Sequence, residues 1–204
     1  MTITDSTYES LKTVGRSLAM RGLNTSHSGN ISIRSGGKMV IKRRAAMLGW
    51  LQKEDLVETA LDEEDSYSLI ASTESGVHRA IYQNTDAMAV IHAHCPYLVT
   101  LSLIEDEITC IDAEGSFMYK RIPVVELDIP AGAKEAAIKV PPVLKNYKIC
   151  VVRSHGAFAK GMTIEDALCN ITGAEQSAMI RYLTMQTGKP LKRDYSKEKD
   201  FSNW

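Results

Sequence analysis

Two short apolar segments that lead into histidines limit most strongly how this chain can fold. Met88–Ile91 runs directly into His92 and His94, and Ile149–Val152 is followed closely by His155. Apolar runs of this length are typical of strands buried on both faces. Residues two apart on a strand point to the same face, so His92 and His94 present their imidazoles on one side. We therefore expect a sheet whose buried strands end in histidine side chains.

The rest of the chain alternates between helical and strand periodicity, which indicates a layered α/β domain. Helices are predicted from Ser6 to Gly22, from Ser72 to Gln83, from Pro96 onward, from Ala131 to Val140, and from Thr163 onward. Strands are predicted at Ile31–Ile33, Met39–Ile41, Met88–Ile91, Ile122–Val125 and Ile149–Val152. One helical turn is expected at Lys53–Asp55. Helices that alternate with strands in this way predict one domain over residues 1–188. The tail 189–204 is charged and has no periodicity, so we expect it to be mobile or ordered only against a partner subunit.

Three local signals set the expected limits of these elements. Ser6 and Glu9 match a capping box at the start of the first helix. Pro141 and Pro142 are expected to end the helix that begins near Ala131. Pro123 cannot donate to a ladder, which predicts an edge strand at Ile122–Val125.

Composition and charge exclude several classes of protein. The 204 residues include 24 Lys plus Arg against 25 Asp plus Glu, so the basic excess of a nucleic-acid binder is missing. No apolar run approaches the roughly 18–20 residues that span a bilayer, and the polar N-terminus lacks the pattern of a secretory signal. The four cysteines form no CxxC pair, which argues against a disulfide scaffold. We expect a cytoplasmic protein with no nucleic-acid or membrane partner.

The histidines have two interpretations. Three imidazoles with one open position form the usual catalytic zinc arrangement, which fits His92, His94 and His155. Histidines at strand ends can also be hydrogen-bonded side chains without a metal, and the spacing alone does not separate the two. Gly156 follows His155 and would allow close backbone approach there.

Two further segments are candidates for anion binding. Ser72 and Thr73 precede Glu74 at the start of a predicted helix, where free amides attract a phosphate. An ordinary N-terminal cap is the alternative at this position. Gly29 and Asn30 lie before a strand, where they form either a simple turn or an oxyanion site.

Taken in order, these motifs resemble the class II aldolase/adducin family. The motifs are Gly29-Asn-Ile-Ser32, Leu48-Gly49 with Glu54-Asp-Leu-Val57, Ala71-Ser-Thr-Glu74 with His78, His92-Ala-His94 and His155-Gly156. The match runs from the first helix to the last and leaves out only the tail. It implies a single layered α/β/α domain around a mainly antiparallel sheet.

The resemblance also implies an activity and a set of site residues. A divalent metal, zinc or else manganese or cobalt, would be held by His92, His94 and His155, with Glu74 as general base and as a fourth ligand when no substrate is bound. The implied reaction is reversible cleavage of a short ketose 1-phosphate to dihydroxyacetone phosphate and an aldehyde, through a metal-stabilised enediolate. Gly29, Asn30, Ser72 and Thr73 would cradle the phosphate. The site would lie between the subunits of a homotetramer.

The chain departs from the family pattern in two places. Family aldolases usually carry T-P-S/T-G in the phosphate loop, where this chain has Lys42-Arg43-Arg44-Ala45. Arg43 or Arg44 is expected to bind an anion, or else both are solvated surface charges. The usual proton-donating tyrosine has no direct equivalent, so Tyr119 is the candidate donor and Glu114 the alternative.

Two other functions fit the same motifs. Sibling branches of the family catalyse dehydration, epimerisation or decarboxylation at a similar metal site. The adducin branch is non-catalytic, and its head domain is expected to lack the metal-binding histidines that are present here.

Overall fold

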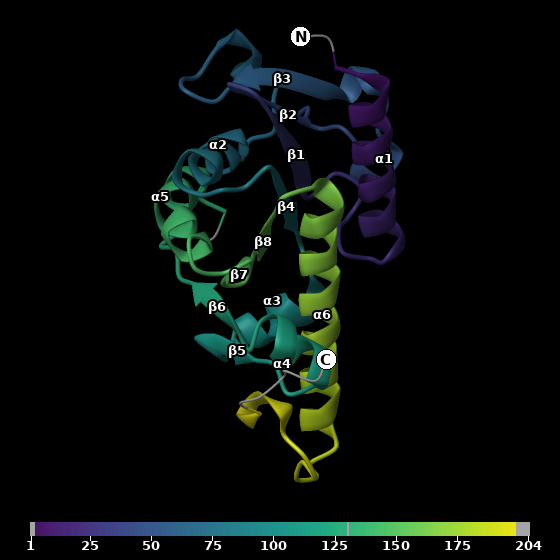
Figure 1. Ribbon diagram of the computed structural model, residues 1–204, viewed down its shortest axis with the longest axis vertical. Coiled ribbons are helices and arrows are strands. Elements are labelled where there is room, and N and C mark those ends of the chain that lie inside the picture. The colour runs from purple at the N-terminus through teal and green to yellow at the C-terminus, as the bar shows by residue number, and fades with distance from the viewer. Residues whose placement is uncertain (1–2, 130, 199–204) are drawn as a thin grey trace.

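The computed structural model describes residues 3–129 and 131–198 (Figure 1). In this part of the chain eight strands form one sheet, in the order β3-β2-β1-β4-β8-β7-β6-β5. The strands are β1 (Asn30–Ser35), β2 (Lys38–Lys42), β3 (Leu56–Ala60), β4 (Ala89–Ala93), β5 (Glu107–Thr109), β6 (Arg121–Val125), β7 (Ile149–Val152) and β8 (Gly156–Gly161). Neighbouring strands are antiparallel except β6 and β7, which are parallel. The predicted mainly antiparallel sheet is confirmed.

Helices cover both faces of this sheet. The α-helices are α1 (Asp5–Met20), α2 (Ser75–Asn84), α3 (Pro96–Ser102), α4 (Ala113–Met118), α5 (Ala133–Leu144) and α6 (Ile164–Gln186). Short 3-10 turns are η1 (Leu48–Trp50), η2 (Lys53–Asp55), η3 (Ser66–Leu69) and η4 (Tyr195–Lys197). Helices α1 and α6 lie on one face and α2 and α5 on the other, which confirms the layered α/β/α fold (Figure 1).

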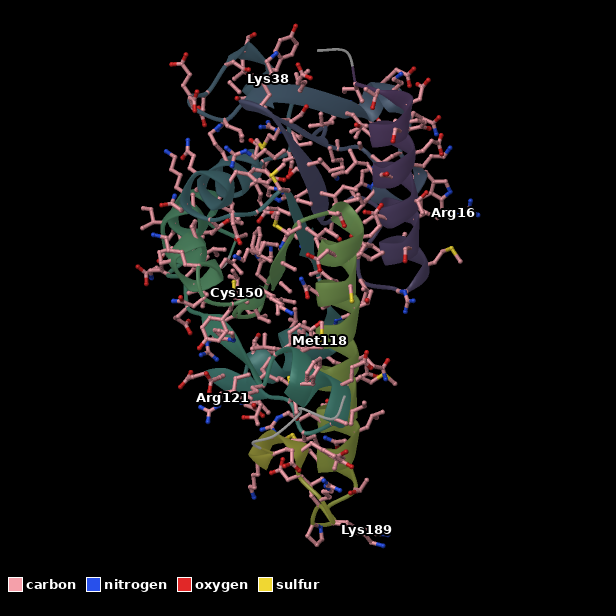
Figure 2. The ribbon with its side chains drawn as sticks, in the orientation of Figure 1. Arg16, Lys38, Met118, Arg121, Cys150 and Lys189 are labelled. Carbon is pink, nitrogen blue, oxygen red and sulfur yellow. The ribbon has the colours of Figure 1, made fainter. Side chains whose placement is uncertain are left out.

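Each central strand contributes to two hydrophobic cores. Ile91 of β4 and Val151 of β7 pack in the core beneath α1 and α6. Their neighbours Val90 and Cys150 pack in the core beneath α2 and α5. Figure 2 shows the Cys150 side chain in the interior, whereas charged side chains such as Arg16 project from the surface. Burial on both faces is the reason that these strands are continuously apolar.

Two helices begin elsewhere than predicted. The cap of α1 is Thr4, whose hydroxyl accepts a hydrogen bond from the Thr7 amide at 3.1 Å, so the predicted capping box of Ser6 and Glu9 is wrong. Glu9 pairs instead with a lysine one turn later on the helix. Helix α2 begins at Ser75 because the preceding residues pair with the sheet: the Ser72 amide donates to the Lys42 carbonyl.

The prolines also behave differently from the prediction. Helix α5 continues through Pro141 and Pro142 to Leu144, because their φ suits a helix and the Pro141 carbonyl still accepts from the Lys145 amide. The prolines remove the amides that would bond to the carbonyls of Ala137 and Ile138. Ile138 is 74% exposed, so water can replace the missing donor there.

The predicted edge strand around Pro123 is also wrong, because β5 pairs along the outer side of β6. Pro123 lies at the end of that ladder, opposite Glu107. The ladder between β6 and β7 begins one residue later, at Val124, so the missing amide of Pro123 lies outside it.

Several short elements had no clear signal in the sequence. Strands β3, β5 and β8 and helix α4 were not predicted. β5 has only three residues, β8 begins and ends in glycine, and α4 has only six residues, so their periodicity along the sequence is weak. The turn at Lys53–Asp55 is confirmed. In the described part of the tail, the Tyr195 amide donates to the Ile111 carbonyl at 3.2 Å, and the tail residues 199–204 lie outside the described residues.

The four cysteines are all free, as expected: Cys95, Cys110 and Cys150 are buried and Cys169 is exposed. Within the described residues, no helix has both the length and the apolar character that crossing a membrane requires.

Glu175 of α6 is a buried carboxyl that makes stability depend on pH. It accepts hydrogen bonds at 2.9 Å from the amides of Tyr97 and Leu98 at the start of α3, and burial raises its pKa from 4.5 to about 7. Folding therefore takes up a proton between these pH values, so the free energy of unfolding falls as pH rises through this window. We expect urea unfolding to show that the difference in stability between wild type and Glu175→Gln changes by about 2 kcal/mol between pH 5 and pH 8.

The exposed Glu165, at the start of the same helix, provides the control. The free energy of unfolding of Glu165→Gln should differ from that of wild type by the same amount at pH 5 and at pH 8. If the difference in the free energy of unfolding between Glu175→Gln and wild type is also the same at both pH values, the raised pKa of Glu175 is contradicted.

Candidate functional site

Three histidines converge at one end of the central strands. His92 lies in β4, His94 directly follows it, and His155 lies in the tight turn between β7 and β8. Because β4 and β8 are neighbours in the sheet, the imidazoles meet, and their ligand atoms lie within 4.8 Å of one another. The Nε2 atoms of His92 and His94 are 3.1 Å apart.

The hydrogen bonding of His92 determines its tautomer. Its Nδ1 lies 3.0 Å from the Ala157 carbonyl oxygen, which can only accept, so Nδ1 carries the proton and Nε2 has a free lone pair. Burial, with repulsion from His155 as a smaller cause, lowers the pKa of both His92 and His94. Neutral imidazoles with convergent lone pairs are the form that binds metal ions, so this donor set fits a divalent cation.

The alternative interpretation, in which the histidines are only hydrogen-bonded and hold no metal, explains less of this geometry. A hydrogen bond from His94 to His92 would account for two rings but not for His155, whose ring centroid lies 4.8 Å from that of His92 and 5.0 Å from that of His94. One cation would satisfy the lone pairs of all three rings.

Gly156 permits this close approach, as the sequence suggested. A Cβ at this position would lie 2.7 Å from the Ala93 carbonyl oxygen and 2.8 Å from Cε1 of His92. Gly156→Ala should therefore displace the histidine rings. We expect it to lower the free energy of unfolding by about 1–3 kcal/mol, as overpacking usually does. We also expect metal affinity, measured by titration with zinc, to fall at least about 10-fold.

Gly37 is the matched control, because a Cβ there would meet no atom within 4 Å. Gly37→Ala should leave both measurements unchanged. Normal zinc affinity in Gly156→Ala would mean that the rings do not need this glycine.

Glu74 places a carboxylate beside the histidines. Its side chain is nearly buried, accepts a hydrogen bond from Asn30 Nδ2 at 2.7 Å, and lies 3.4 Å from His92 Nε2. Asn30 is in position because it pairs with His92 in the register of β1 and β4. Glu74 occupies the cap position of α2 but makes no capping hydrogen bond with its side chain. The arrangement therefore differs from the ordinary helix cap that was the alternative.

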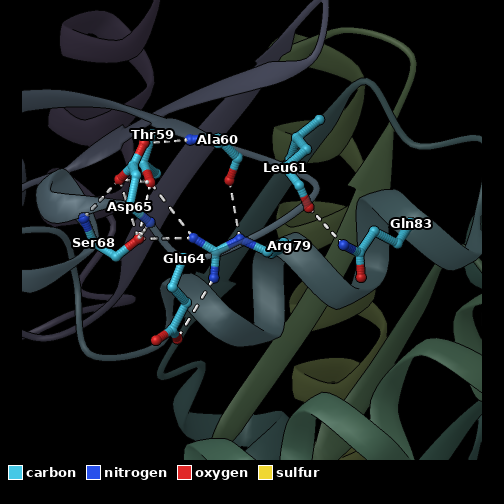
Figure 3. Close-up of polar contacts among 8 residues, drawn as sticks. All are labelled: Thr59, Ala60, Leu61, Glu64, Asp65, Ser68, Arg79 and Gln83. Carbon is cyan, nitrogen blue, oxygen red and sulfur yellow. Dashed lines mark hydrogen bonds and ion pairs between the residues drawn. The ribbon is translucent and has the colours of Figure 1, made fainter.

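The segment that carries Ser72, Thr73 and Glu74 is anchored by a polar network in the preceding loop (Figure 3). Arg79 of α2 donates from Nε to the Ala60 carbonyl at 3.0 Å and from Nη2 to the Ser68 hydroxyl at 3.0 Å. Asp65 accepts from the Thr59 hydroxyl at 2.7 Å and from the Ala60 amide at 2.9 Å. These contacts hold the loop between β3 and α2 against the sheet.

His78 has a structural position. Its ring is fully buried, with Nδ1 2.7 Å from the Ser32 hydroxyl, and burial lowers its pKa to about 3. It does not line the cavity described below, although it shares a helix face with Glu74 in the sequence pattern.

A cavity of about 240 Å³ opens beside Glu74, His94 and His155. The residues predicted to bind phosphate that line it are Gly29, Asn30, Ser72, Thr73 and Arg44. Gly29 has a φ of +71°, and a Cβ there would overlap the Asn24 side chain, so the turn requires glycine. Of the predicted metal, base and phosphate residues, all but His92 and Arg43 therefore line this one cavity, and His92 is buried behind it.

The two arginines of the altered loop are placed differently. Arg43 forms an ion pair with Asp55 at 2.7 Å and does not line this cavity. Arg44 does line it, together with Lys42 of the same altered loop and with His27, which was not singled out from the sequence. Nothing in the local sequence separates Arg43 from Arg44, because the difference depends on Asp55, twelve residues away.

The two candidate proton donors lie elsewhere in this chain. The Tyr119 hydroxyl is 3.4 Å from the carbonyl oxygens of Cys169 and Asn170 on α6, and burial raises its pKa. Glu114 is in the first turn of α4. Neither residue lines the cavity.

Comparison with known proteins shows which family this chain resembles over most of its length. Residues 9–182 match the profile of the class II aldolase and adducin N-terminal domain. An L-fuculose phosphate aldolase from Methanococcus maripaludis is 29% identical over 156 residues, 76% of this chain and 84% of that protein. A 3-oxo-tetronate 4-phosphate decarboxylase from Pectobacterium atrosepticum is 27% identical, with 84% and 85% of the two chains covered. The crystal structure of L-fuculose-1-phosphate aldolase from Thermus thermophilus is 32% identical, with a TM-score of 0.83 over 90% of this chain and 97% of that one.

Proposed function

Since the chain belongs to the class II aldolase/adducin family, we propose that it is a metal-dependent aldolase, a carbon–carbon lyase. Its substrate is a short ketose 1-phosphate of the fuculose-1-phosphate type, cleaved reversibly to dihydroxyacetone phosphate and an aldehyde. The observation that carries this proposal is the convergence of His92, His94 and His155 beside Glu74, next to a cavity that Glu74, His94 and His155 line.

The residues of the site have distinct tasks in this proposal. His92, His94 and His155 hold the divalent cation, which when bound supplies Lewis-acid stabilisation of negative charge on the substrate oxygens. Glu74 moves the proton at the carbon next to the substrate carbonyl. Asn30 supports this step, since its hydrogen bond at 2.7 Å fixes the carboxylate in orientation.

The phosphate is held at the part of the cavity formed by two loops. Gly29 comes from the loop before β1, Asn30 is the first residue of β1, and Ser72 and Thr73 come from the segment before α2. The Ser72 and Thr73 hydroxyls and the Gly29 and Thr73 amides are suitable donors to phosphate oxygens, whereas the Ser72 amide already donates to the Lys42 carbonyl. Zinc as the metal, a homotetramer with the site between subunits, and a cytoplasmic location stay predictions.

Decarboxylation of a phosphorylated oxo acid is the second candidate. Lys42 and Arg44 in the cavity favour it over the other sibling reactions, because they can bind a carboxylate in addition to a phosphate. The similarity to the Pectobacterium atrosepticum decarboxylase supports it further. A non-catalytic, adducin-like role is disfavoured by the convergent histidines.

The test is release of dihydroxyacetone phosphate from fuculose 1-phosphate and related ketose 1-phosphates, with and without a chelator. We expect release that stops with the chelator and returns when zinc is added. If the folded, metal-loaded protein releases none, aldol cleavage is wrong. Release of carbon dioxide from a 3-oxo acid 4-phosphate would then identify the second candidate.

A further inference from the structure

The turn that carries His155 is held by the last residue of helix α3. Between β7 and β8 the chain reverses over residues 153–155, and within this turn the Ser154 amide donates to the Ser102 hydroxyl at 3.1 Å. The same hydroxyl donates to the Val99 carbonyl at 2.7 Å, so it acts as donor and acceptor at once. Ser102 is fully buried in α3, and its hydroxyl is therefore a fixed point against which the turn is held.

Ser154 needs this support because of its backbone conformation. Its φ is +62°, a left-handed value that is costly for a residue with a Cβ. Such conformations persist where surrounding contacts impose them. The hydrogen bond from the His155 amide to the Val152 carbonyl at 3.0 Å closes the turn around Ser154. The bond to Ser102 is made by Ser154 itself, so it acts directly on the strained residue.

Arg153 fastens the same turn to the end of α3. Its guanidinium donates to the Ser102 carbonyl and, at 3.2 Å, to the Glu105 carbonyl. It also pairs with the carboxylates of Asp106 and Glu126. A cation is favourable at the C-terminal end of a helix, where carbonyl oxygens are left free. The turn and the helix end are therefore joined by a side chain from each of them.

Helix α3 also connects this turn to a second histidine of the triad. The helix begins at Pro96, two residues after His94, and its first amides donate to Glu175. Its Leu98 side chain is fully buried in the core. A helix that is held at both ends and packed along its length is a rigid spacer between the segments that carry His94 and His155.

We propose that Ser102 is a positioning residue of the metal site, which holds Ser154 in its left-handed conformation and so directs the His155 imidazole toward the other two histidines. Arg153 assists by fixing the turn to the end of α3. The inference rests on the proposed function in so far as the three histidines bind the metal. Neither Ser102 nor Arg153 lines the cavity described above, so both act through the turn and not by contact with a substrate.

Zinc titration of Ser102→Ala tests the proposal. Without the hydroxyl, Ser154 can relax to a negative φ, and metal binding must then restore the strained turn. We expect zinc affinity to fall about 10-fold, the lower end of the range for residues that orient a metal ligand. Ser116 of α4 is the matched control, because it is also fully buried and its hydroxyl donates to a backbone carbonyl, that of Cys110, at 2.8 Å. Ser116→Ala should lower the thermal stability but bind zinc as wild type does.

Ser154→Gly distinguishes positioning from a general loss of stability. Glycine adopts a positive φ at little cost, so the turn no longer needs the Ser102 hydroxyl to maintain it. The effect of Ser102→Ala on zinc affinity should therefore be at least about 3-fold smaller in a Ser154→Gly background. A merely structural Ser102 would give the same loss in both backgrounds. The visible absorption of cobalt(II)-loaded Ser102→Ala should also differ from that of wild type, because it reports how the ligands are arranged around the metal.

Two results would overturn the proposal: wild-type zinc affinity in a folded Ser102→Ala, or an equal loss of affinity with and without Ser154→Gly. If Ser102→Ala does not fold, Arg153→Lys decides, because lysine keeps the charge but loses the fork that reaches two carbonyls. Its zinc affinity should fall at least about 3-fold, and unchanged affinity would contradict the proposal. A wild-type protein that binds no zinc would refute the metal site and this role with it. Zinc binding without aldol cleavage would refute only the activity.

Discussion

Glu74→Gln should lower the rate of aldol cleavage by about 10²- to 10⁴-fold, the usual contribution of a general base. The amide of glutamine has nearly the same shape as the carboxylate, and its oxygen can still accept the hydrogen bond from Asn30. The cavity should therefore keep its geometry while losing the group that takes the proton. We expect kcat to fall with little change in the free energy of unfolding.

A second measurement separates loss of the base from loss of substrate binding. Exchange of the dihydroxyacetone phosphate C–H proton with deuterium from solvent, followed by NMR, requires the base but no aldehyde. It should be lost in Glu74→Gln. The exposed Glu9 on α1 provides the control, and Glu9→Gln should exchange as wild type does. Normal exchange in Glu74→Gln would mean that another group takes the proton.

His94→Ala should remove most of the bound metal and with it the activity. One of three imidazoles is lost, and His92 Nε2, which is fully buried, would lose the partner that lies 3.1 Å away. We expect zinc affinity to fall at least about 100-fold, beyond the range usual for residues that only orient a ligand. Metal content of the purified protein and zinc titration measure this effect.

His27 is the matched control for this substitution. It lines the same cavity but does not belong to the histidine triad. His27→Ala should keep its metal. If His94→Ala keeps both its metal and its fold, the triad is not the metal site.

Much of the site could be predicted because its signals are local. The spacing of His92 and His94 determines that both rings lie on one face of a strand, wherever that strand pairs. The apolar runs at Met88–Ile91 and Ile149–Val152 indicate burial on both faces, since no polar residue interrupts them. Glu74 and Asn30 were candidates from their positions before a helix and a strand, and the resemblance to a family gave them the roles of base and phosphate contact.

The parts that could not be predicted depend on contacts between distant residues. Pro141 and Pro142 carry a strong local signal for a helix end, yet helix α5 continues because its packing outweighs two missing hydrogen bonds. Strand β6 became internal only because β5 pairs with it. Local propensity is a weak prior wherever tertiary contacts compete with it.

The sequence by itself determined the alternation of helices and strands, the two histidine-bearing strands and the residue types available for chemistry, because these follow from periodicity along the chain. Tertiary structure decided which side chains share the cavity. It turned Arg43 toward Asp55 and left Arg44 unpaired, buried Lys42 between two carbonyls, and placed Tyr119 against α6. The physical reason is that a charge or hydroxyl takes the partner that the fold brings within reach, and those partners lie between four and about fifty residues away along the chain.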